Sequence, residues 1–116
     1  MIKGAHIMFY SSKANAARKY LKEKLNFKAQ DIGGGWLIFK VPEANMGCHP
    51  ADEHSPSGTH NVSFYCENIQ VAVKKMKGKG VKFIDKIEDH GYGFVTHFYL
   101  PGKIKIQLYQ PKYKLK

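Results

Sequence analysis

The sequence has 116 residues, the length of one domain, and its hydrophobic fraction of 43% is sufficient for a core and excludes intrinsic disorder. Its net charge of +10 comes mainly from lysine, because Arg18 is the single arginine among nineteen basic residues. Specific recognition of phosphates and base edges favours the planar guanidinium of arginine. The composition therefore argues against a specific nucleic-acid-binding protein.

Compartment and membrane association are predicted from features that the sequence lacks. No stretch approaches the roughly 18 apolar residues of a membrane span, and residues 1–6 lead into a strand-like segment rather than a signal peptide. The two cysteines, Cys48 and Cys66, form no CxxC pair and supply neither a disulfide framework nor a zinc ribbon. We therefore expect a cytoplasmic protein without a membrane partner.

An internal repeat organises the chain. Residues 6–10 (HIMFY) match residues 61–65 (NVSFY), and helix-spaced alanine and lysine positions follow both segments. Each copy predicts a strand, a helix and three further strands. We expect one domain over residues 1–116, with a first module at about 1–50, a linker at 50–59, a second module at 60–112 and a basic tail at 113–116.

The first module begins with a predicted strand over residues 4–11, with Ile7 and Phe9 on one face. Asn15 is the expected cap of a helix that ends near Asn26. The inward face of that helix is predicted to carry Ala17, Leu21 and Leu25. Three strands are expected to follow, at residues 28–32, 36–41 and 45–49.

The second module repeats this order. A strand is predicted over residues 61–66 and a helix from Asn68 to the glycines at 78 and 80. Three strands follow, near residues 81–87, 93–100 and 104–109. The loop over residues 89–93 either closes over the site as a lid or is a plain turn of small and polar residues.

Five segments of the second module carry a resemblance to a known family: residues 60–69 (HNVSFYCENI), 79–84 (KGVKFI), 91–93 (GYG), 100–102 (LPG) and 106–111 (IQLYQP). With the repeat, they resemble the vicinal oxygen chelate superfamily, which includes glyoxalase I, bleomycin-resistance proteins and extradiol dioxygenases. The resemblance implies an α+β fold in which tandem βαβββ modules form one curved mixed sheet, a cup, with helices on its convex face. It also implies a homodimer that binds a small molecule or a divalent metal in the cup.

Strand alternation predicts which side chains face this cup, because the helix-facing side is the more apolar. Isoleucine, valine, leucine and phenylalanine occupy one parity of the first, fifth and last strands. The opposite parity is polar and aromatic, as suits a small-molecule pocket. The candidate ligand-binding residues are His6, Met8, Tyr10, His49, Asn61, Ser63, Tyr65, Lys105, Gln107 and Tyr109.

The resemblance implies a metal site with one ligand from each of four strands, usually two histidines and two glutamates. His6 matches the first position, whereas Asn61 and Gln107 stand where histidine and glutamate belong. The remaining ligand position in the first module is either Asn45 or His49. The candidate metal ligands are His6, His49 and Gln107. Such a set contains no carboxylate to neutralise the ion or act as a base. The cofactor is thus either a divalent ion, among Zn, Ni, Mn and Fe, or none.

These observations predict a small glyoxalase-like protein that binds an oxygen-rich or aromatic molecule in the cup. Three alternatives remain open at this point. The first is a metal-dependent lyase, isomerase or dioxygenase of the same superfamily, and the second is a metal-free sequestration protein similar to bleomycin-resistance proteins. The third, a basic nucleic-acid-binding module, rests on charge alone.

Overall fold

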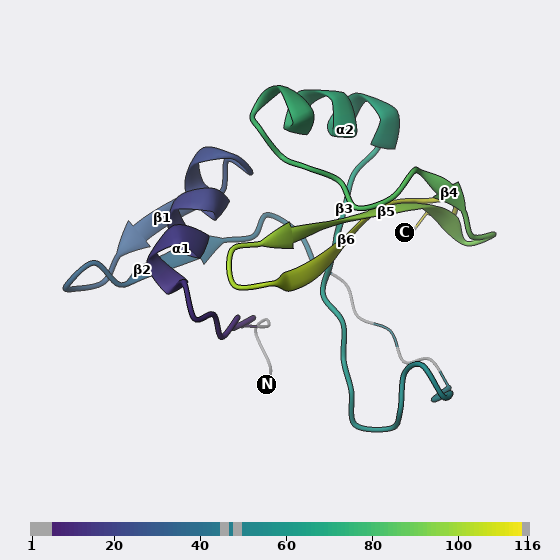
Figure 1. The fold of residues 1–116 in the computed structure, drawn as a ribbon, viewed down its shortest axis with the longest axis horizontal. Coiled ribbons are helices and arrows are strands. Elements are labelled where there is room, and N and C mark those ends of the chain that lie inside the picture. The colour runs from purple at the N-terminus through teal and green to yellow at the C-terminus, as the bar shows by residue number, and fades with distance from the viewer. Residues whose placement is uncertain (1–5, 45–46, 48–49, 115–116) are drawn as a thin grey trace.

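The computed structural model describes residues 6–44, 47 and 50–114, and it confirms the α+β class (Figure 1). In chain order the elements are α1 (Ala14–Glu23), β1 (Lys28–Asp31), β2 (Leu37–Lys40), β3 (Ser63–Tyr65), α2 (Ile69–Gly78), β4 (Glu88–Asp89), β5 (Gly93–Leu100) and β6 (Ile104–Pro111). The described strands form two sheets instead of the single curved sheet expected, namely β1-β2 and β3-β6-β5-β4. No helix in the described ranges is long and apolar enough to cross a membrane.

The hairpin of β5 and β6 is the centre of the larger sheet. The two strands pair antiparallel along their whole length, from Gly93 opposite Pro111 to Leu100 opposite Ile104. On the other side of β6, β3 pairs with it in parallel, and Ser63 lies opposite Gln107. On the other side of β5, β4 pairs antiparallel. The hairpin was predicted at nearly these bounds.

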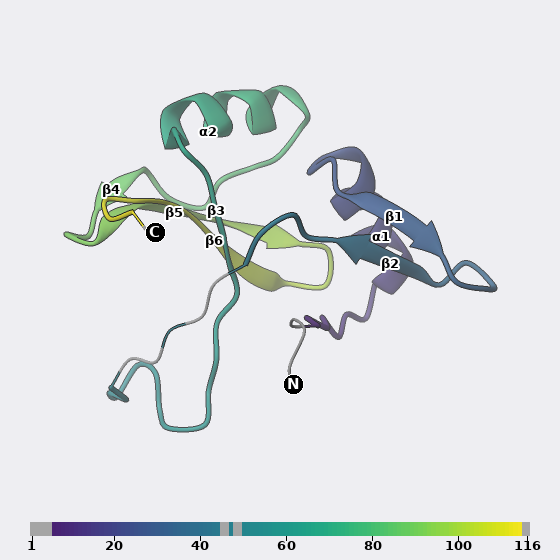
Figure 2. The same cartoon turned by 180° about the vertical axis from the view of Figure 1, so that it is seen from behind.

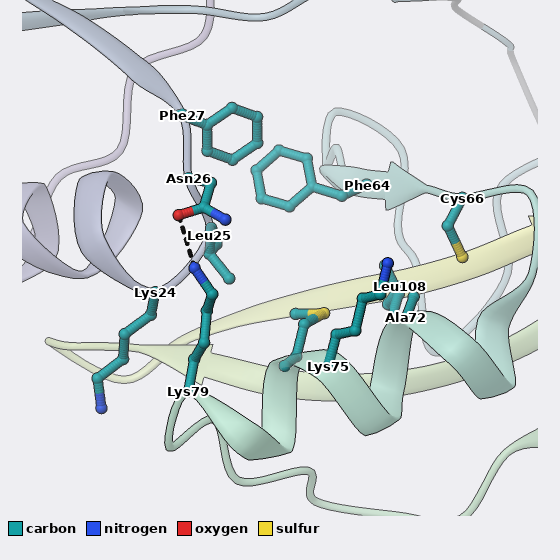
Figure 3. Close-up of a pocket in the computed structure, with 11 residues that line it drawn as sticks. Lys24, Leu25, Asn26, Phe27, Phe64, Cys66, Ala72, Lys75, Lys79 and Leu108 are labelled. Atoms are coloured by element: carbon teal, nitrogen blue, oxygen red, sulfur yellow. Dashed lines mark hydrogen bonds between the residues drawn. The ribbon is translucent and has the colours of Figure 1, made fainter.

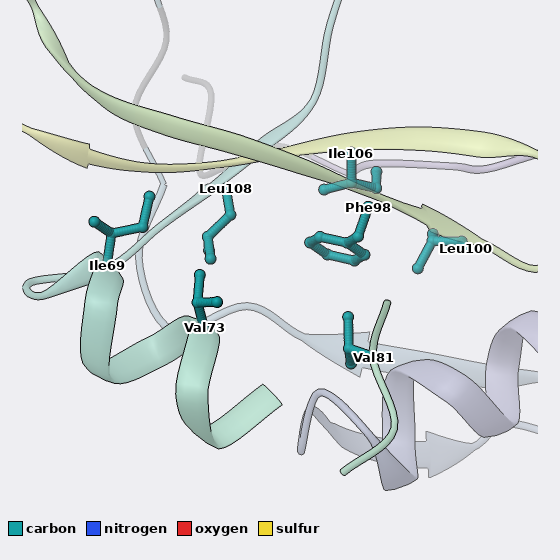
Figure 4. Close-up of a cluster of buried hydrophobic side chains, with 7 residues drawn as sticks. All are labelled: Ile69, Val73, Val81, Phe98, Leu100, Ile106 and Leu108. Carbon is teal, nitrogen blue, oxygen red and sulfur yellow. The ribbon is translucent and has the colours of Figure 1, made fainter. Parts of the chain in front are cut away.

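The core lies between this sheet and α2, which covers one face of it in both views (Figures 1 and 2). Side chains from α2 and from both hairpin strands meet there (Figure 4). The buried cluster consists of Ile69, Val73, Val81, Phe98, Leu100, Ile106 and Leu108. The inward parity predicted for β6 is thereby confirmed, and Phe64 of β3 packs against the same cluster, as its parity predicts.

The two helices begin differently. Asn68 caps α2 as predicted, because its Oδ1 accepts a hydrogen bond from the Val71 backbone N–H at 3.1 Å. The predicted Asn15 cap is wrong: α1 begins at Ala14, and the Asn15 Oδ1 accepts from the Arg18 guanidinium. The inward face predicted for α1 is confirmed, since Ala17 is buried and Leu21 and Leu25 pack against the core.

The first predicted strand, over residues 4–11, is absent from the part that the structure describes, residues 6–11. Within the described chain, the backbone of this segment pairs with no neighbouring strand. It is held instead by the Ser11 hydroxyl, which donates to the Pro101 carbonyl oxygen at 2.7 Å. Residues 28–32 and 36–41 do form strands, β1 and β2, whereas the strand predicted over 45–49 falls almost wholly outside the described residues.

The strand predicted over residues 81–87 is reduced to one bridge between Phe83 and Phe98, and the regular pairing moves to β4. The cause is the side chain of Asp85. Its Oδ1 accepts from the His97 backbone N–H at 2.9 Å, where a strand would have offered a carbonyl oxygen. At this edge of β5, a hydrogen bond to a side chain therefore replaces a backbone hydrogen bond between strands.

Gly93 marks a place where the hairpin has no room for a side chain. A Cβ at this position would lie 2.5 Å from the carbonyl oxygen of Gln110, so Gly93→Ala must displace backbone. We expect it to lower the free energy of unfolding by about 1–2 kcal/mol in urea titrations. The matched variant, Gly78→Ala at the end of α2, meets no atom within 4 Å and is expected to stabilise by about 0.5–1 kcal/mol. Equal changes in the free energy of unfolding of the two variants would contradict the pairing of β5 with β6 that brings Gly93 against Gln110.

Candidate functional site

The face of the larger sheet that points away from α2 carries the polar and aromatic side chains. Directly opposite residues of paired strands share a face. The register pairs Tyr65 with Tyr109, and pairs His97 with Gln107, while their chain neighbours Phe98 and Leu108 lie in the core. The side chains that gather on or over this side of the sheet, which we name the aromatic face, are Tyr65, Tyr92, His97, Gln107, Tyr109 and Tyr113.

Tyr109 is the centre of the aromatic face. Its ring centroid lies 6.2 Å from that of Tyr65 and 6.2 Å from that of Tyr92, both in tilted or edge-on packing. Its hydroxyl lies 3.0 Å from the hydroxyl of Tyr113. Burial, followed by this hydrogen bond, raises the pKa of Tyr109 to about 12. The phenol is therefore neutral at physiological pH and acts as a hydrogen-bonding group.

Two further hydrogen bonds fix the rim of this face. The Tyr65 hydroxyl donates to Glu43 Oε2 at 2.8 Å, and this bond is the first cause of a raised Tyr65 pKa. The bond ties β3 to the segment after β2. Gln107 donates from Nε2 to the Tyr92 hydroxyl at 3.5 Å, which links β6 to the turn between β4 and β5. Within the predicted loop over residues 89–93, Tyr92 thus lies in a turn and contacts the aromatic face.

His97 and Asp85 form a pair at the edge of the same sheet. His97 Nδ1 lies 2.7 Å from Asp85 Oδ2, and the Thr96 hydroxyl donates to Asp85 Oδ1 at 2.8 Å. Burial raises the pKa of the Asp85 carboxyl, but the hydrogen bonds from Thr96 and His97 outweigh it and the net shift is downward. An ionised Asp85 favours the tautomer with the proton on Nδ1, which leaves Nε2 of His97 as a proton acceptor.

The structure brings together one half of the predicted ligand-binding set. The residues from β3 and β6, namely Ser63, Tyr65, Lys105, Gln107 and Tyr109, share the face opposite α2. The first-module residues His6, Met8 and Tyr10 lie in the irregular segment before α1 and are exposed, and Asn61 is exposed ahead of β3. His49 and Asn45 lie outside the described residues.

Three residues near this face were not predicted, namely Asp85, His97 and Tyr113, and Tyr92 was predicted only as part of the loop over residues 89–93. The signal for His97 was available, because it alternates with the apolar Phe98 and Leu100 in a strand that was predicted correctly. Asp85, Tyr92 and Tyr113 lie outside regular strands. Alternation has no bearing on such positions, and only the folded chain brings them to the sheet.

Comparison with protein-family models matches residues 3–108 to the Glyoxalase/Bleomycin resistance protein/Dioxygenase superfamily. No curated protein matches the sequence. Among solved structures, TnmS3, an antibiotic binding protein from Streptomyces sp. CB03234, superposes with a TM-score of 0.66 at 18% identity, over 97% of this chain and 100% of its own. A glyoxalase/bleomycin resistance protein/dioxygenase from Nocardioides gives a TM-score of 0.62 at 16% identity, over 100% and 93%. These likenesses show a shared fold.

Proteins of this superfamily often use divalent metals, so we asked whether the described residues fit one. No group of three or more histidine, cysteine, aspartate or glutamate side chains converges anywhere in the described ranges. Gln107 supplies a neutral amide, a weak ligand, and His97 is held by Asp85. The described donor set therefore does not fit a metal, and we derive no chemistry through one. The set of His6, His49 and Gln107 stays a prediction, since His49 is not described.

Proposed function

The chain belongs to the Glyoxalase/Bleomycin resistance protein/Dioxygenase superfamily, and from that premise we propose that it binds a small aromatic, oxygen-rich molecule on the aromatic face. One observation supports this most strongly: Tyr65, Tyr92 and Tyr113 surround Tyr109 beside two polar groups, Gln107 and His97. Rigid aromatic walls with a few placed polar groups are the usual composition of a small-molecule site.

The chemistry of the face favours a flat ligand with oxygen substituents. Tyrosine rings pack against a planar ring system, and the hydroxyls of Tyr92 and Tyr113 and the amide of Gln107 offer hydrogen bonds to oxygen atoms. Lys105 of β6 and the net charge of +10 favour an anion. TnmS3, an antibiotic binding protein of the same fold, supports binding without turnover as the primary role.

A second candidate function, proton transfer, is favoured by the pair of His97 and Asp85. On this proposal the substrate is an α-hydroxycarbonyl compound, and Nε2 of His97 takes the proton from the carbon that bears the hydroxyl group and returns it to the former carbonyl carbon. The hydroxyl proton moves to the former carbonyl oxygen, and Asp85 stabilises the imidazolium formed between the two steps. The net change is an isomerisation that needs no oxidant or second reactant. A metal-dependent lyase, isomerase or dioxygenase reaction remains the alternative if the chain binds Zn, Ni, Mn or Fe.

We also propose that the protein acts as a cytoplasmic homodimer. Its radius of gyration is 15.1 Å, against about 13 Å for a compact chain of this length. In both views α1, β1 and β2 lie to one side of the larger sheet (Figures 1 and 2). A second copy would cover surface that the extended chain leaves open.

Calorimetric titration with 1-hydroxy-2-naphthoate, a planar anion with neighbouring oxygen atoms, tests the binding proposal. We expect saturable binding that weakens about five- to tenfold in Tyr92→Ala, because an aromatic contact is lost at a side chain that is 47% exposed. The matched control is Trp36→Ala, at a half-exposed aromatic side chain away from this face. Equal affinity of all three proteins would contradict the proposal, and binding that requires added metal would favour the metal-dependent alternative.

A further inference from the structure

A recess lies on the other side of β3, where the chain leaving α1 meets α2 (Figure 3). Its volume is about 250 Å³. The lining residues are Lys24, Leu25, Asn26, Phe27, Phe64, Cys66, Ala72, Lys75, Met76, Lys79 and Leu108. Phe64 and Leu108 pack toward the core, and Tyr65 and Tyr109 face the opposite way. The recess, which we name the lysine cavity, is therefore separate from the aromatic face.

The walls of the lysine cavity are apolar. The rings of Phe27 and Phe64 lie 5.1 Å apart between centroids, at an interplanar angle of 55°. Met76 of α2 and Leu108 of β6 complete the apolar lining, and both belong to the hydrophobic core or pack against it. Such walls suit a hydrocarbon group.

The polar groups at this cavity are cationic. Three lysines line it, and no aspartate or glutamate is among its lining residues. Lys79 donates to Asn26 Oδ1 at 2.8 Å, a neutral partner, and Lys24 Nζ lies 5.2 Å from the centroid of the Tyr20 ring. Within the described chain Lys75 has no hydrogen bond or ion pair. Among the described residues, none of the three lysines is thus paired with an anionic side chain.

The cavity is held in shape by the end of α1. Asn26, which lies three residues after the last residue of α1, adopts a left-handed backbone conformation with φ of 61°. The Phe27 N–H then donates to the Leu21 carbonyl oxygen at 3.1 Å, and the Asn26 side chain accepts from Lys79. Backbone and side-chain bonds thus fix one wall against the other.

We propose that the lysine cavity binds a medium-chain carboxylate, with its hydrocarbon tail against the packed rings of Phe27 and Phe64 and its carboxylate on Lys75 and Lys79. Apolar walls with uncompensated ammonium groups match an anion that carries one apolar tail. If each carbon group of a chain occupies about the 30 Å³ that one water molecule occupies in the liquid, a volume of 250 Å³ holds a chain of roughly eight carbon groups. That number corresponds to the chain of octanoate.

An NMR titration with octanoate tests this proposal. We expect saturable shifts in the resonances of Phe27, Phe64 and Met76, and weaker shifts with octan-1-ol, which has the same tail and no charge. The double variant Lys75→Glu, Lys79→Glu is expected to bind octanoate at least about tenfold more weakly, because two attractive charges become repulsive. The single variant Lys75→Gln gives a smaller loss in the same direction.

The matched control is the double variant Lys74→Glu, Lys77→Glu, which makes the same change in net charge on the same helix at lysines that do not line the cavity. At physiological salt, where charges beyond about 8 Å are screened, we expect its affinity to stay within about twofold of the parent. Equal losses in both double variants, shifts confined to Tyr65 and Tyr92, or no shift at millimolar octanoate would overturn the proposal. None of these outcomes depends on whether the aromatic face binds 1-hydroxy-2-naphthoate.

Discussion

Replacing Phe98 by alanine is expected to lower the free energy of unfolding by about 3–5 kcal/mol. The Phe98 side chain is fully buried, at 0% exposure, and packs edge-on against Phe83 at 5.8 Å between centroids. Around it, Leu100 of β5 and Ile106 of β6 belong to the same cluster beneath α2 (Figure 4). Truncation removes the buried ring and leaves a cavity that the paired backbones of the hairpin cannot close.

Urea titrations followed by circular dichroism measure this loss as a fall in the transition midpoint. The matched control is Tyr99→Ala, which also removes an aromatic ring, from the next residue of β5, whose side chain is 49% exposed on the opposite face. We expect the control to lose less than about 1 kcal/mol. Losses of similar size at residues 98 and 99 would show that the inward parity of β5 is assigned wrongly.

The parts of the fold that could be predicted from the sequence are those where one pattern decides the outcome. Along β6, Ile104, Ile106 and Leu108 alternate without interruption with polar residues, so strand and inward face follow together. The start of α2 was also predictable, because Asn68 offers a local cap to its own helix.

Other parts depend on contacts that no local pattern records. Residues 6–10 also alternate in part, with Ile7 and Phe9 on one parity. Alternation fixes a strand only where a partner offers its backbone, and in the described chain none does so for residues 6–11. The strand predicted over residues 81–87 does not form for another reason: the Asp85 side chain occupies the position in which a backbone carbonyl oxygen would accept the hydrogen bond.

The residues of the candidate site likewise include some that the sequence predicted and others that it did not. Tyr65, Gln107 and Tyr109 were predicted because they alternate with core residues on well-patterned strands. His97 was missed although its strand was predicted, because apolar Val95 lies on the same face as His97 and polar Thr96 lies on the core face, which breaks the sequence alternation just before His97. Both Val95 and Thr96 are almost fully buried. Burial at two successive positions occurs here because the Thr96 hydroxyl is satisfied by Asp85.

Asp85→Ala is expected to lower the free energy of unfolding by about 2–3 kcal/mol at neutral pH. It removes the carboxylate that accepts from Thr96, from the His97 backbone and from the His97 ring. Asp85→Asn keeps an oxygen acceptor and loses the charge, so we expect a loss of about 1 kcal/mol. Urea titrations rank the three proteins, and equal stability of the alanine variant and the parent would contradict a structural role for the carboxylate.

The pH dependence of these variants has a definite sign. The pKa of Asp85 is lower in the folded chain than its ordinary value of 3.8, so the ionised carboxylate stabilises the fold at pH values above that value. This contribution is lost as the pH falls through the folded-state pKa. The difference in stability between the parent and Asp85→Asn should therefore shrink as the pH falls below about 4. A difference that does not shrink between pH 4 and the acid unfolding of the parent would contradict this contribution of the ionised carboxylate.

The same substitution separates binding from proton transfer at the aromatic face. In Asp85→Asn the amide nitrogen can turn toward His97 Nδ1, which then accepts, so the ring proton moves to Nε2 and this nitrogen no longer accepts a proton. Ring ¹⁵N chemical shifts of His97 report this change of tautomer directly. If the protein only binds 1-hydroxy-2-naphthoate, its affinity should change little, because the rings of Tyr65, Tyr92 and Tyr109 are untouched. A proton-transfer activity would instead be abolished, since an imidazole protonated at Nε2 cannot accept the substrate proton.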